Sequence, residues 1–354
     1  FGWSVSISAD GTYALVGAID TQGAGGWPDR GGVHVFIRSG TSWTAQQKLV
    51  NTSSSSTQDF GASVSISNDG VYAVIGSPAE TVGSASGAGV SLVFIRSGTS
   101  WTEQQELVDP VATADENFGC SVSISSDGTY ALIGAERGAG SGNGPYQGEA
   151  HIFIRSGTSW THQQKLEITL GFTNDMFGTS VSISNDGAIA LIGANRDGTA
   201  LGADYTDNTG RAHTFTRSGT SWTYDTKLED PNKSTGDFFG WSVAISGDGK
   251  YCAVGAPNDD ANGSDAGAAH VFGTNPLFNT TRNVEASKFI GDGSLLTGVS
   301  AAASNLQSAT DTGNVTSNTI QFTNATTGLV ATGNVEASKF IGDGSLLTGI
   351  ALNA

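Results

Sequence analysis

Residues 118–135 read FGCSVSISSDGTYALIGA, and this stretch decides the fold of the chain. It contains two short runs, SVSIS and YALIGA, joined by Asp127 and Gly128. Alternating polar and apolar residues are typical of a β-strand, and an Asp-Gly pair between two such runs predicts a tight hairpin. Val122 and Ile124 therefore share one face of the first predicted strand.

The stretch recurs along the chain at a nearly fixed period. Its first eight residues read FGWSVSIS, FGASVSIS, FGCSVSIS, FGTSVSIS and FGWSVAIS, and successive copies lie 59, 58, 59 and 62 residues apart. A period of this length indicates a repeat protein in which each unit is one small supersecondary motif. The copies begin at Phe1, Phe60, Phe118, Phe177 and Phe239, and their Asp-Gly turns at Asp10, Asp69, Asp127, Asp186 and Asp248.

Each copy continues with a variable Gly/Asp/Asn-rich loop, a third run such as AHIFIRSG, a Ser-Gly-Thr-Ser turn and a fourth run such as SWTHQQKL. Four antiparallel strands per repeat are typical of a β-propeller blade, which neighbouring blades must cover. We therefore predict an all-β protein with a propeller over residues 1–274 and blades starting at 1, 60, 118, 177 and 239. The fifth copy lacks the fourth run. The turn glycines, expected to have positive φ, are Gly40, Gly98, Gly157 and Gly219.

The composition agrees with this fold and excludes several classes of protein. Of the 354 residues 50 are Gly, and the 16 basic and 33 acidic residues give a net charge of −17. The acidic balance argues against nucleic-acid binding, and no apolar run is long enough for a membrane span. Cys120 and Cys252 occupy different positions in the repeat, so we expect free buried thiols.

Phe-Gly at the start of the repeat and Gly-Ala after its second strand resemble the FG-GAP repeats of integrin α-subunit propellers. The longer pattern, FGxSVSIS, DG, YALVGA, HVFxRSGTSW and QQKL, resembles still more a bacterial and viral subfamily of these repeats. The resemblance covers residues 1 to about 274 and implies a propeller, part of a seven-bladed ring if it follows the integrin type. Because residue 1 is Phe, we expect a processed or partial chain, and two further upstream units would complete such a ring.

Residues 275–354 follow a different pattern. NVEASKFIGDGSLLTG begins at Asn283 and again at Asn334, with a Ser/Thr/Asn-rich segment between the two copies. The tail resembles fibre repeats of structural proteins from phages and large algal viruses. Its apolar content is thin for a monomeric core, so the resemblance implies a β-rich stalk formed by three chains. A flexible linker is the alternative.

Calcium is the first ligand to consider. Integrin-type repeats carry an Asp-x-Asp-x-Asp-Gly-x-x-Asp loop after the first strand, because calcium takes six to eight oxygen ligands. In the third repeat the other ligand positions around Asp127 hold Ser123, Ser125 and Ala131. One carboxylate per turn is too few, so we expect Asp10 and its equivalents to be plain turn residues.

The loops between the second and third strands are better candidates for ligand binding, because they vary while the strands hardly do. In the fourth and fifth loops the candidate binding residues are Asp197, Asp204, Asp207, Asp259, Asp260, Asn262 and Asp265. Among them Asp259, Asp260 and Asp265 are weak calcium candidates, and a solvated acidic loop is the alternative. We predict no firm metal site and no cofactor.

Three other residue types recur at fixed positions. We expect the histidines to pack between blades, because equivalent positions of adjacent blades are too far apart to share a metal ion. We expect each Trp to cap the blade edge against the preceding strand, with sugar stacking as the alternative, and each Arg to pair with backbone carbonyls or acids. These residues are His34, His151, His213 and His270, with Leu92 at the same position in the second repeat; Trp43, Trp101, Trp160 and Trp222; and Arg38, Arg96, Arg155 and Arg217.

The sequence contains no nucleophile elbow, zinc-protease motif or P-loop. We therefore expect a non-enzymatic module, extracellular or on a virion or appendage surface, that binds a cell-surface glycan or protein receptor. Other structural proteins of the same particle and two further copies, joined through the tail, are the other expected partners. The alternatives are a purely structural spacer of a capsid or filament and a polysaccharide-active enzyme on a propeller scaffold.

Overall fold

The computed structural model describes residues 1–19, 31–52, 59–140, 146–168, 173–198, 207–260 and 263–273. Within these residues the chain forms strands and turns, and no helix. The predicted stalk, residues 275–354, lies outside the described residues.

The strands form five antiparallel sheets, which we number as blades 1 to 5 in chain order. Blade 1 contains β1 (Val5–Ile7), β2 (Tyr13–Ala18), β3 (Gly32–Ser39) and β4 (Ser42–Leu49), and blade 2 contains β5 (Ser63–Ile66), β6 (Tyr72–Ser77), β7 (Val90–Ser97) and β8 (Ser100–Leu107). Blade 3 contains β9 (Phe118–Ile124), β10 (Tyr130–Ala135), β11 (Glu149–Ser156) and β12 (Ser159–Leu166), and blade 4 contains β13 (Phe177–Ile183), β14 (Ile189–Ala194), β15 (Arg211–Ser218) and β16 (Ser221–Leu228). Blade 5 contains β17 (Ser242–Ile245), β18 (Tyr251–Ala256) and β19 (Ala268–Gly273).

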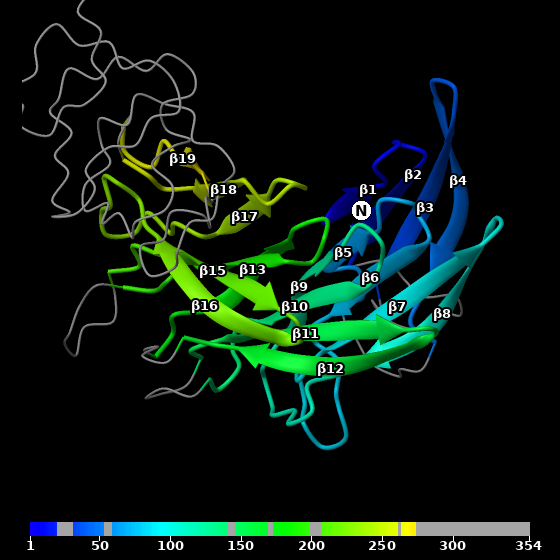
Figure 1. The fold of residues 1–354 in the computed structure, drawn as a ribbon, viewed down its shortest axis with the longest axis horizontal. Helices are drawn as coiled ribbons and strands as arrows, with labels where there is room; N and C mark the ends of the chain where they lie inside the picture. The colour runs from blue at the N-terminus through cyan, green and yellow to red at the C-terminus, as the bar shows by residue number, and fades with distance from the viewer. Residues whose placement is uncertain are drawn as a thin grey trace, which may run out of the picture. The chain divides into compact units, whose positions relative to one another are not determined.

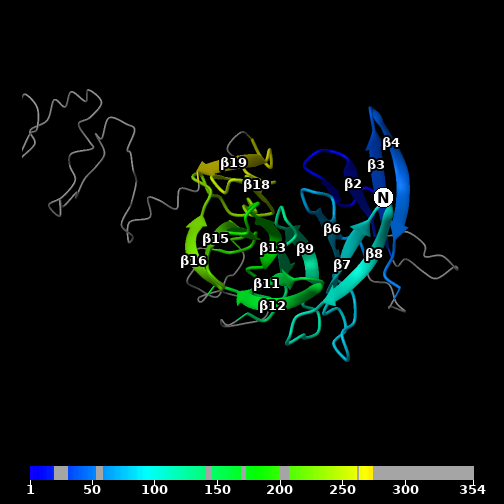
Figure 2. The same ribbon diagram turned by 45° about the vertical axis from the view of Figure 1, so that its right-hand side comes forward.

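Each sheet pairs its strands in chain order, four strands in blades 1 to 4 and three in the described part of blade 5. The blades follow one another around a common centre, with the first strand of each blade innermost (Figures 1 and 2). The predicted all-β propeller of four-stranded blades is thereby confirmed. The glycines of the Ser-Gly-Thr-Ser turns have φ between 60° and 63°, as the turn requires.

The hydrophobic cores lie between consecutive blades rather than within one sheet. Leu15 and Val35 of blade 1 pack with Phe60 and Leu92 of blade 2. Cores of the same kind, with side chains from two consecutive blades, lie at the other three interfaces. Each blade therefore depends on its neighbours for burial.

Two glycines of the repeat lie where the backbones of adjacent blades come closest. A Cβ on Gly134, in β10, would lie 2.0 Å from the carbonyl oxygen of Gly178, the glycine of the next Phe-Gly pair. Gly178 has a φ of +93°, and a Cβ there would lie 2.4 Å from the carbonyl oxygen of Glu149. The repeat therefore needs Gly in both places. The equivalent pairs are Gly17 with Gly61, Gly76 with Gly119, and Gly193 with Gly240.

The serines of the first strand face the neighbouring blade rather than solvent. Ser121 Oγ donates to the carbonyl oxygen of Gly178 at 2.8 Å, and Ser123 Oγ accepts the N–H of Ile183 at 3.1 Å. The alternating serines therefore join the inner strands of adjacent blades. The same two contacts are made by Ser4 and Ser6, Ser63 and Ser65, and Ser180 and Ser182.

A Trp–Gln clamp joins the outer strands. The backbone N–H of Trp160 donates to Gln105 Oε1 and its carbonyl accepts from Gln105 Nε2, both at 2.8 Å, while the indole donates to Gln104 Oε1 at 3.0 Å. Trp101 and Trp222 are clamped in the same way by Gln pairs of the preceding blade. These three Trp residues are 3% exposed, whereas Trp43 in blade 1 is 42% exposed. Each of these Trp residues pairs with the preceding strand of its own sheet, as predicted, Trp101 with Arg96 and Trp160 with Arg155. In addition, the Gln clamp makes it cap the preceding blade.

The repeated Arg residues hold the hairpin turns. Arg96 Nε donates to the carbonyl oxygen of Gly70 at 2.6 Å, and its guanidinium lies 4.3 Å from the ring centre of Tyr13 in the preceding blade. Arg155 and Arg217 make the equivalent pair of contacts. The predicted pairing with backbone carbonyls is confirmed, and the cation–π contact adds a further link between blades.

Blades 1 and 5 each present one uncovered face. Val5 in blade 1 is 71% exposed, whereas its equivalent Val64 is 9% exposed. Val271 in blade 5 is also 71% exposed, although Val35 and Val93 at the same position are fully buried. Within the described residues, the two end blades therefore lack one of the neighbours that every inner blade has.

We expect Gly134→Ala to lower the free energy of unfolding by about 3 kcal/mol, because the added methyl group meets a backbone carbonyl of the next blade. Gly157→Ala is the matched control, since no atom lies within 4 Å of its Cβ position. Its cost should be about 1 kcal/mol, from the positive φ alone. Urea unfolding followed by Trp fluorescence measures both, and equal losses would contradict the close approach of the blades.

Candidate functional site

The variable parts of the repeat gather at one edge of every blade. The second and fourth strands run in the same direction, since each pairs antiparallel with the third. The loops after the second strand and the linkers after the fourth strand therefore reach the same edge, which we call the loop face. The opposite edge carries the nearly identical Asp-Gly and Ser-Gly-Thr-Ser turns. Sequence variation is thus concentrated on the loop face.

A cavity of about 270 Å³ opens at the loop face near the centre of the blades. Its wall includes the residue that follows Phe-Gly in each of blades 1 to 4, where the innermost strand begins. The remaining wall residues come from the loops and linkers. The wall is formed by Trp3, Ile19, Asp59, Ala62, Pro78, Ala79, Asn117, Cys120, Glu136 and Thr179.

Sequence analysis missed this cavity, although one signal for it is present. Within the frame FGxSVSIS the position x is Trp, Ala, Cys, Thr and Trp, while the residues around it hardly change. A position that varies between otherwise nearly identical repeats is not constrained by the core packing that keeps its neighbours the same. Here that position faces the cavity. Cys120 and Cys252 are free cysteines, and Cys252 is buried as predicted. Cys120 is only partly buried, because it lines the cavity, so the prediction of burial is wrong for it.

Glu136 is a charged group of the cavity wall that hydrogen bonds hold in place. Its carboxylate accepts a hydrogen bond from Asn117 Nδ2 at 3.2 Å and another from Thr179 Oγ1 at 3.1 Å. Trp3, 67% exposed, adds a large aromatic surface to the same wall. An aromatic ring beside an oriented carboxylate can stack on the apolar face of a sugar and accept hydrogen bonds from its hydroxyls.

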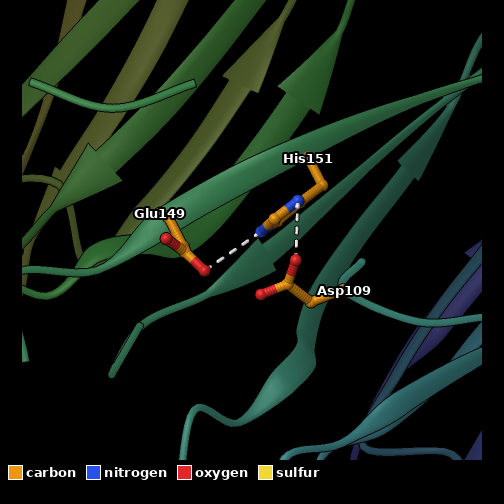
Figure 3. A group of neighbouring side chains, drawn as sticks. All are labelled: Asp109, Glu149 and His151. Atoms are coloured by element: carbon orange, nitrogen blue, oxygen red, sulfur yellow. Dashed lines mark hydrogen bonds and ion pairs between the residues drawn. The ribbon is translucent and has the colours of Figure 1, made fainter. Parts of the chain in front are cut away.

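Two of the repeated histidines, His151 and His213, are buried and contact acids, and the partly buried His270 also faces acids. The partly buried His34 packs against Phe1 instead. His151 in β11 is fully buried, and its Nε2 lies 3.2 Å from Glu149 Oε1 (Figure 3). Its Nδ1 lies 3.1 Å from His162 Nε2 and 3.9 Å from Asp109 Oδ1, which comes from the end of blade 2. The predicted structural role agrees with this burial, whereas the acidic partners were not predicted.

Glu149 is held in its ionised form by its neighbours. Burial raises the pKa of this carboxyl, but the hydrogen bond and charge of His151, together with Lys165, outweigh burial and lower the pKa to about 2. Lys165 Nζ lies 3.1 Å from Glu149 Oε2. Glu149 is therefore paired with the protein's own Lys165 and His151.

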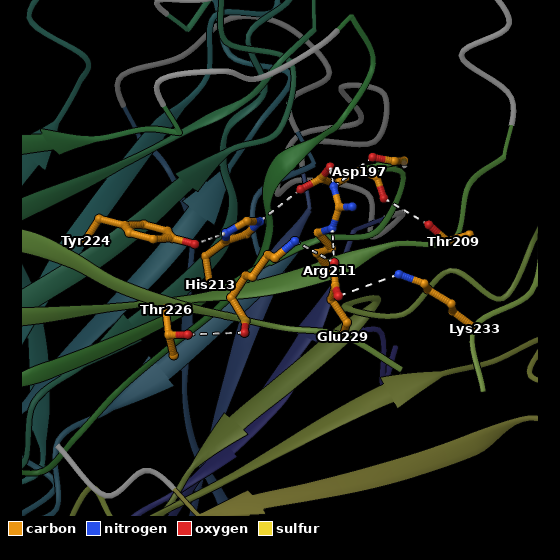
Figure 4. Close-up of polar contacts among 10 residues, drawn as sticks. Asp197, Thr209, Arg211, His213, Tyr224, Thr226, Glu229 and Lys233 are labelled. Atoms are coloured by element: carbon orange, nitrogen blue, oxygen red, sulfur yellow. Dashed lines mark hydrogen bonds and ion pairs between the residues drawn. The ribbon is translucent and has the colours of Figure 1, made fainter. Parts of the chain in front are cut away.

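Asp197, one of the predicted loop-binding residues, belongs to a similar network in blade 4. It is buried, forms an ion pair with Arg211, and its Oδ2 lies 3.1 Å from His213 Nε2 (Figure 4). Arg211 Nε also donates to Glu229 Oε1 at 2.8 Å. Hydrogen bonds from Lys227 and then from Arg211 lower the pKa of Glu229 to about 2. Asp197 is therefore engaged by the protein's own cations.

The remaining predicted loop residues do not converge. Asp259 is buried, with Oδ2 3.2 Å from His270 Nε2, whereas Asp260 and Asp265 are exposed. Asp260 Oδ1 accepts the N–H of Asp265 at 2.7 Å and so closes its own loop. Asp207 lies beside Gly198 at half burial. The three weak calcium candidates are thus split between interior and surface. Asp204 and Asn262 lie outside the described residues.

Asp10 behaves as the turn residue that the sequence predicts. Its carboxylate accepts hydrogen bonds from Thr12 Oγ1 at 2.6 Å, Thr12 N–H at 2.8 Å and Ser8 Oγ at 2.7 Å. The hydrogen bonds from Thr12 and Ser8 lower its pKa to about 2. The carboxylate therefore stabilises its own hairpin.

Sheets of four antiparallel strands around a common centre, joined in chain order, define the chain as a β-propeller protein. The family model of the FG-GAP repeat matches residues 43–90, 101–153, 160–215 and 222–272, more than half of the chain. The chain belongs to the FG-GAP repeat family. Such repeats typically occur in extracellular or surface proteins.

No curated protein matches the chain. Among solved structures, it is similar to a protein proposed to be a 6-phosphogluconolactonase, from Bacteroides uniformis ATCC 8492. The two share 11% sequence identity with a TM-score of 0.49, and the match covers 78% of this chain and 68% of that chain. A likeness of this degree carries no argument about activity. The described residues contain no helix able to cross a bilayer.

We expect the Glu149 network to make stability depend on acid pH. The folded-state pKa of Glu149 is lowered from 4.5 to about 2, so its ionised form stabilises the fold above about pH 4.5, and this contribution is lost as the pH falls towards 2. Glu149→Gln should lower the free energy of unfolding by about 3 kcal/mol near neutral pH, with a difference that shrinks between pH 4.5 and 2. Urea unfolding over a pH series measures this.

Glu106→Gln is the control, because Glu106 is an exposed carboxyl on β8. It should change stability near neutral pH by less than about 0.5 kcal/mol. A Glu149→Gln effect of the same size near pH 6 and near pH 2 would contradict the assignment.

Proposed function

We propose that the protein is a non-enzymatic recognition module that binds a glycan through the loop face. The binding site is centred on the cavity lined by Trp3 and Glu136, which we call the axial cavity. The observation that carries this proposal is the separation of constant and variable residues. The strands and the turns of one edge repeat almost unchanged, while the loops, the linkers and the residue after Phe-Gly differ from blade to blade. A rigid scaffold with variation confined to one face is the usual arrangement of a binding protein.

The chemistry of the cavity favours a carbohydrate over a nucleic acid or a large apolar ligand. Trp3 offers a stacking surface and Glu136 a fixed hydrogen-bond acceptor. The net charge of −17 disfavours polyanions. A neutral or amino-bearing sugar on a cell surface is the class of receptor that fits these groups, and exposed protein loops can extend the contact.

The proposed setting is an extracellular, virion or appendage surface, in which the propeller is the head of a fibre. The support for this part is the fibre-like sequence of residues 275–354, for which we propose a trimeric stalk. Other structural proteins of the same particle would then hold the stalk.

Glycan-array and cell-binding assays on the full chain test the proposal. Trp3→Ala and Glu136→Gln should each weaken saturable binding about tenfold or more, as expected for loss of an anchor at the centre of an interface. Thr102→Ala, an exposed change on β8 outside the cavity, is the matched control and should bind as the unaltered protein.

Three results would overturn the proposal. Absence of saturable binding to any glycan or cell surface would favour a purely structural spacer. Equal binding by the Trp3→Ala and Thr102→Ala variants would show that the cavity is not part of the binding site. Turnover of a polysaccharide by the purified protein would show an enzyme.

A further inference from the structure

In each of blades 2 to 4 a buried carboxylate at the loop face meets a nitrogen donor supplied by the protein, although carboxylate and donor come from different positions of the repeat. The donor is an amide in blade 2, an ammonium in blade 3 and a guanidinium in blade 4. The pairs are Asn51 Nδ2 with Glu80 Oε2 at 3.1 Å, Lys165 Nζ with Glu149 Oε2 at 3.1 Å, and Arg211 with Asp197. Each carboxylate is thus matched by a nitrogen donor.

Blade 5 departs from this arrangement. Asp230, from the linker after blade 4, and Asp259, from the loop after β18, both face His270: their Oδ2 atoms lie 3.5 Å and 3.2 Å from its Nε2. The strand position that Arg211 occupies opposite Ala194 in blade 4 is taken by Ala268 opposite Ala256 in blade 5. The guanidinium of blade 4 therefore has no counterpart there.

Two buried carboxylate oxygens at this place have no hydrogen-bond partner, Asp230 Oδ2 and Asp237 Oδ1. The two residues are 3% and 1% exposed. No Lys or Arg in the described part of the chain forms an ion pair with either of them. Asp230 Oδ2 lies 3.5 Å from His270 Nε2 without forming a hydrogen bond, so this oxygen points into the group rather than away from it. A buried carboxylate without a cation is costly, so this group calls for a positive charge.

His270 Nε2 lies 3.5 Å from Asp230 Oδ2 and 3.2 Å from Asp259 Oδ2, spacings that one ion with bonds of about 2.0–2.2 Å can bridge, and the three residues form a group able to hold a metal ion. Imidazole with two carboxylates suits Zn²⁺ or Mn²⁺, whereas Ca²⁺ takes six to eight oxygens. We propose that one divalent transition-metal ion binds to Asp230, Asp259 and His270 and ties blade 5 to the linker from blade 4. The carboxylates of Asp230 and Asp259 would balance the charge of such an ion, and Asp237 is a further buried acid beside them.

The comparable group in blade 3 is less suited to a metal ion. Lys165 already neutralises Glu149, and both ring nitrogens of His151 contact other side chains, Glu149 and His162. The contrast locates the proposed site at one interface only. A bound ion would stabilise the fold at this interface, because its binding free energy adds to the free energy of unfolding. Blade 5, which has one uncovered face, would gain most from this.

The test measures metal content and thermal unfolding of the full chain. Protein stripped with a chelator and dialysed should regain one ion per chain with Zn²⁺ or Mn²⁺, and its Tm should rise by roughly 4 °C or more at a hundredfold excess over Kd. Ca²⁺ at the same concentration should give no comparable rise. Circular dichroism on each sample checks that the stripped protein remains folded.

Three variants separate the site from other acidic groups. His270→Leu should abolish binding while keeping the packing, since Leu92 occupies this position in blade 2. His213→Leu is the matched control and should retain one ion per chain. Ala268→Arg, which copies Arg211, should abolish metal binding and raise the Tm of the metal-free protein, so that loss of binding cannot be attributed to unfolding.

The proposal is overturned if the stripped protein shows no rise in Tm with either transition metal, or if Ca²⁺ alone gives the rise. It is equally overturned if His270→Leu or Ala268→Arg binds the ion as the unaltered protein does. Loss of the ion from His213→Leu together with its retention by His270→Leu would place the site in blade 4 instead.

Discussion

The closest approach of two backbones, at the glycine pairs between adjacent blades, is the constraint on which the rest of the propeller depends. A Cβ at Gly134 would fall 2.0 Å from the carbonyl oxygen of Gly178, so the absence of side chains sets how near the blades stand. At that separation Ser121 reaches the same carbonyl and Trp160 reaches Gln105. A wider spacing would break the inner and outer contacts together and would leave the cores between the blades loosely packed.

The sequence predicts the blades well because their information is local. Alternation around Val122 identifies a strand, and the positive φ of Gly157 follows from its turn. Contacts between blades are not local, since the partners lie in the next repeat. The alternating serines show which side chains share one face of the first strand, but not which part of the next blade covers that face. Likewise, nothing in the sequence near Trp160 identifies Gln105, 55 residues earlier, as its partner.

The candidate site was harder to predict for a related reason. An acidic loop has the same composition whether its side chains are solvated or buried, and the outcome depends on residues elsewhere. Asp197 is taken by Arg211, whereas Asp259 meets His270 and Asp230. The axial cavity escaped prediction because its wall gathers one residue from each of several repeats, and only the arrangement of blades brings Trp3 and Thr179 to the same cavity.

The Trp–Gln clamp has a consequence for how such a chain can lengthen by gene duplication. Blades 1 to 3 carry the Gln pair and blades 2 to 4 carry the Trp that it holds, while blade 4 has Asp225 and Thr226 instead and the fifth repeat has no such Trp. Each repeat therefore supplies one side of the clamp, the Gln pair, and the following repeat must supply the Trp. An extra copy inserted between blades 2 and 3 would find a matching partner on both sides, whereas one inserted after blade 4 would inherit an unmatched edge. The Gln and Trp residues of the outer strands therefore restrict which repeat can follow which.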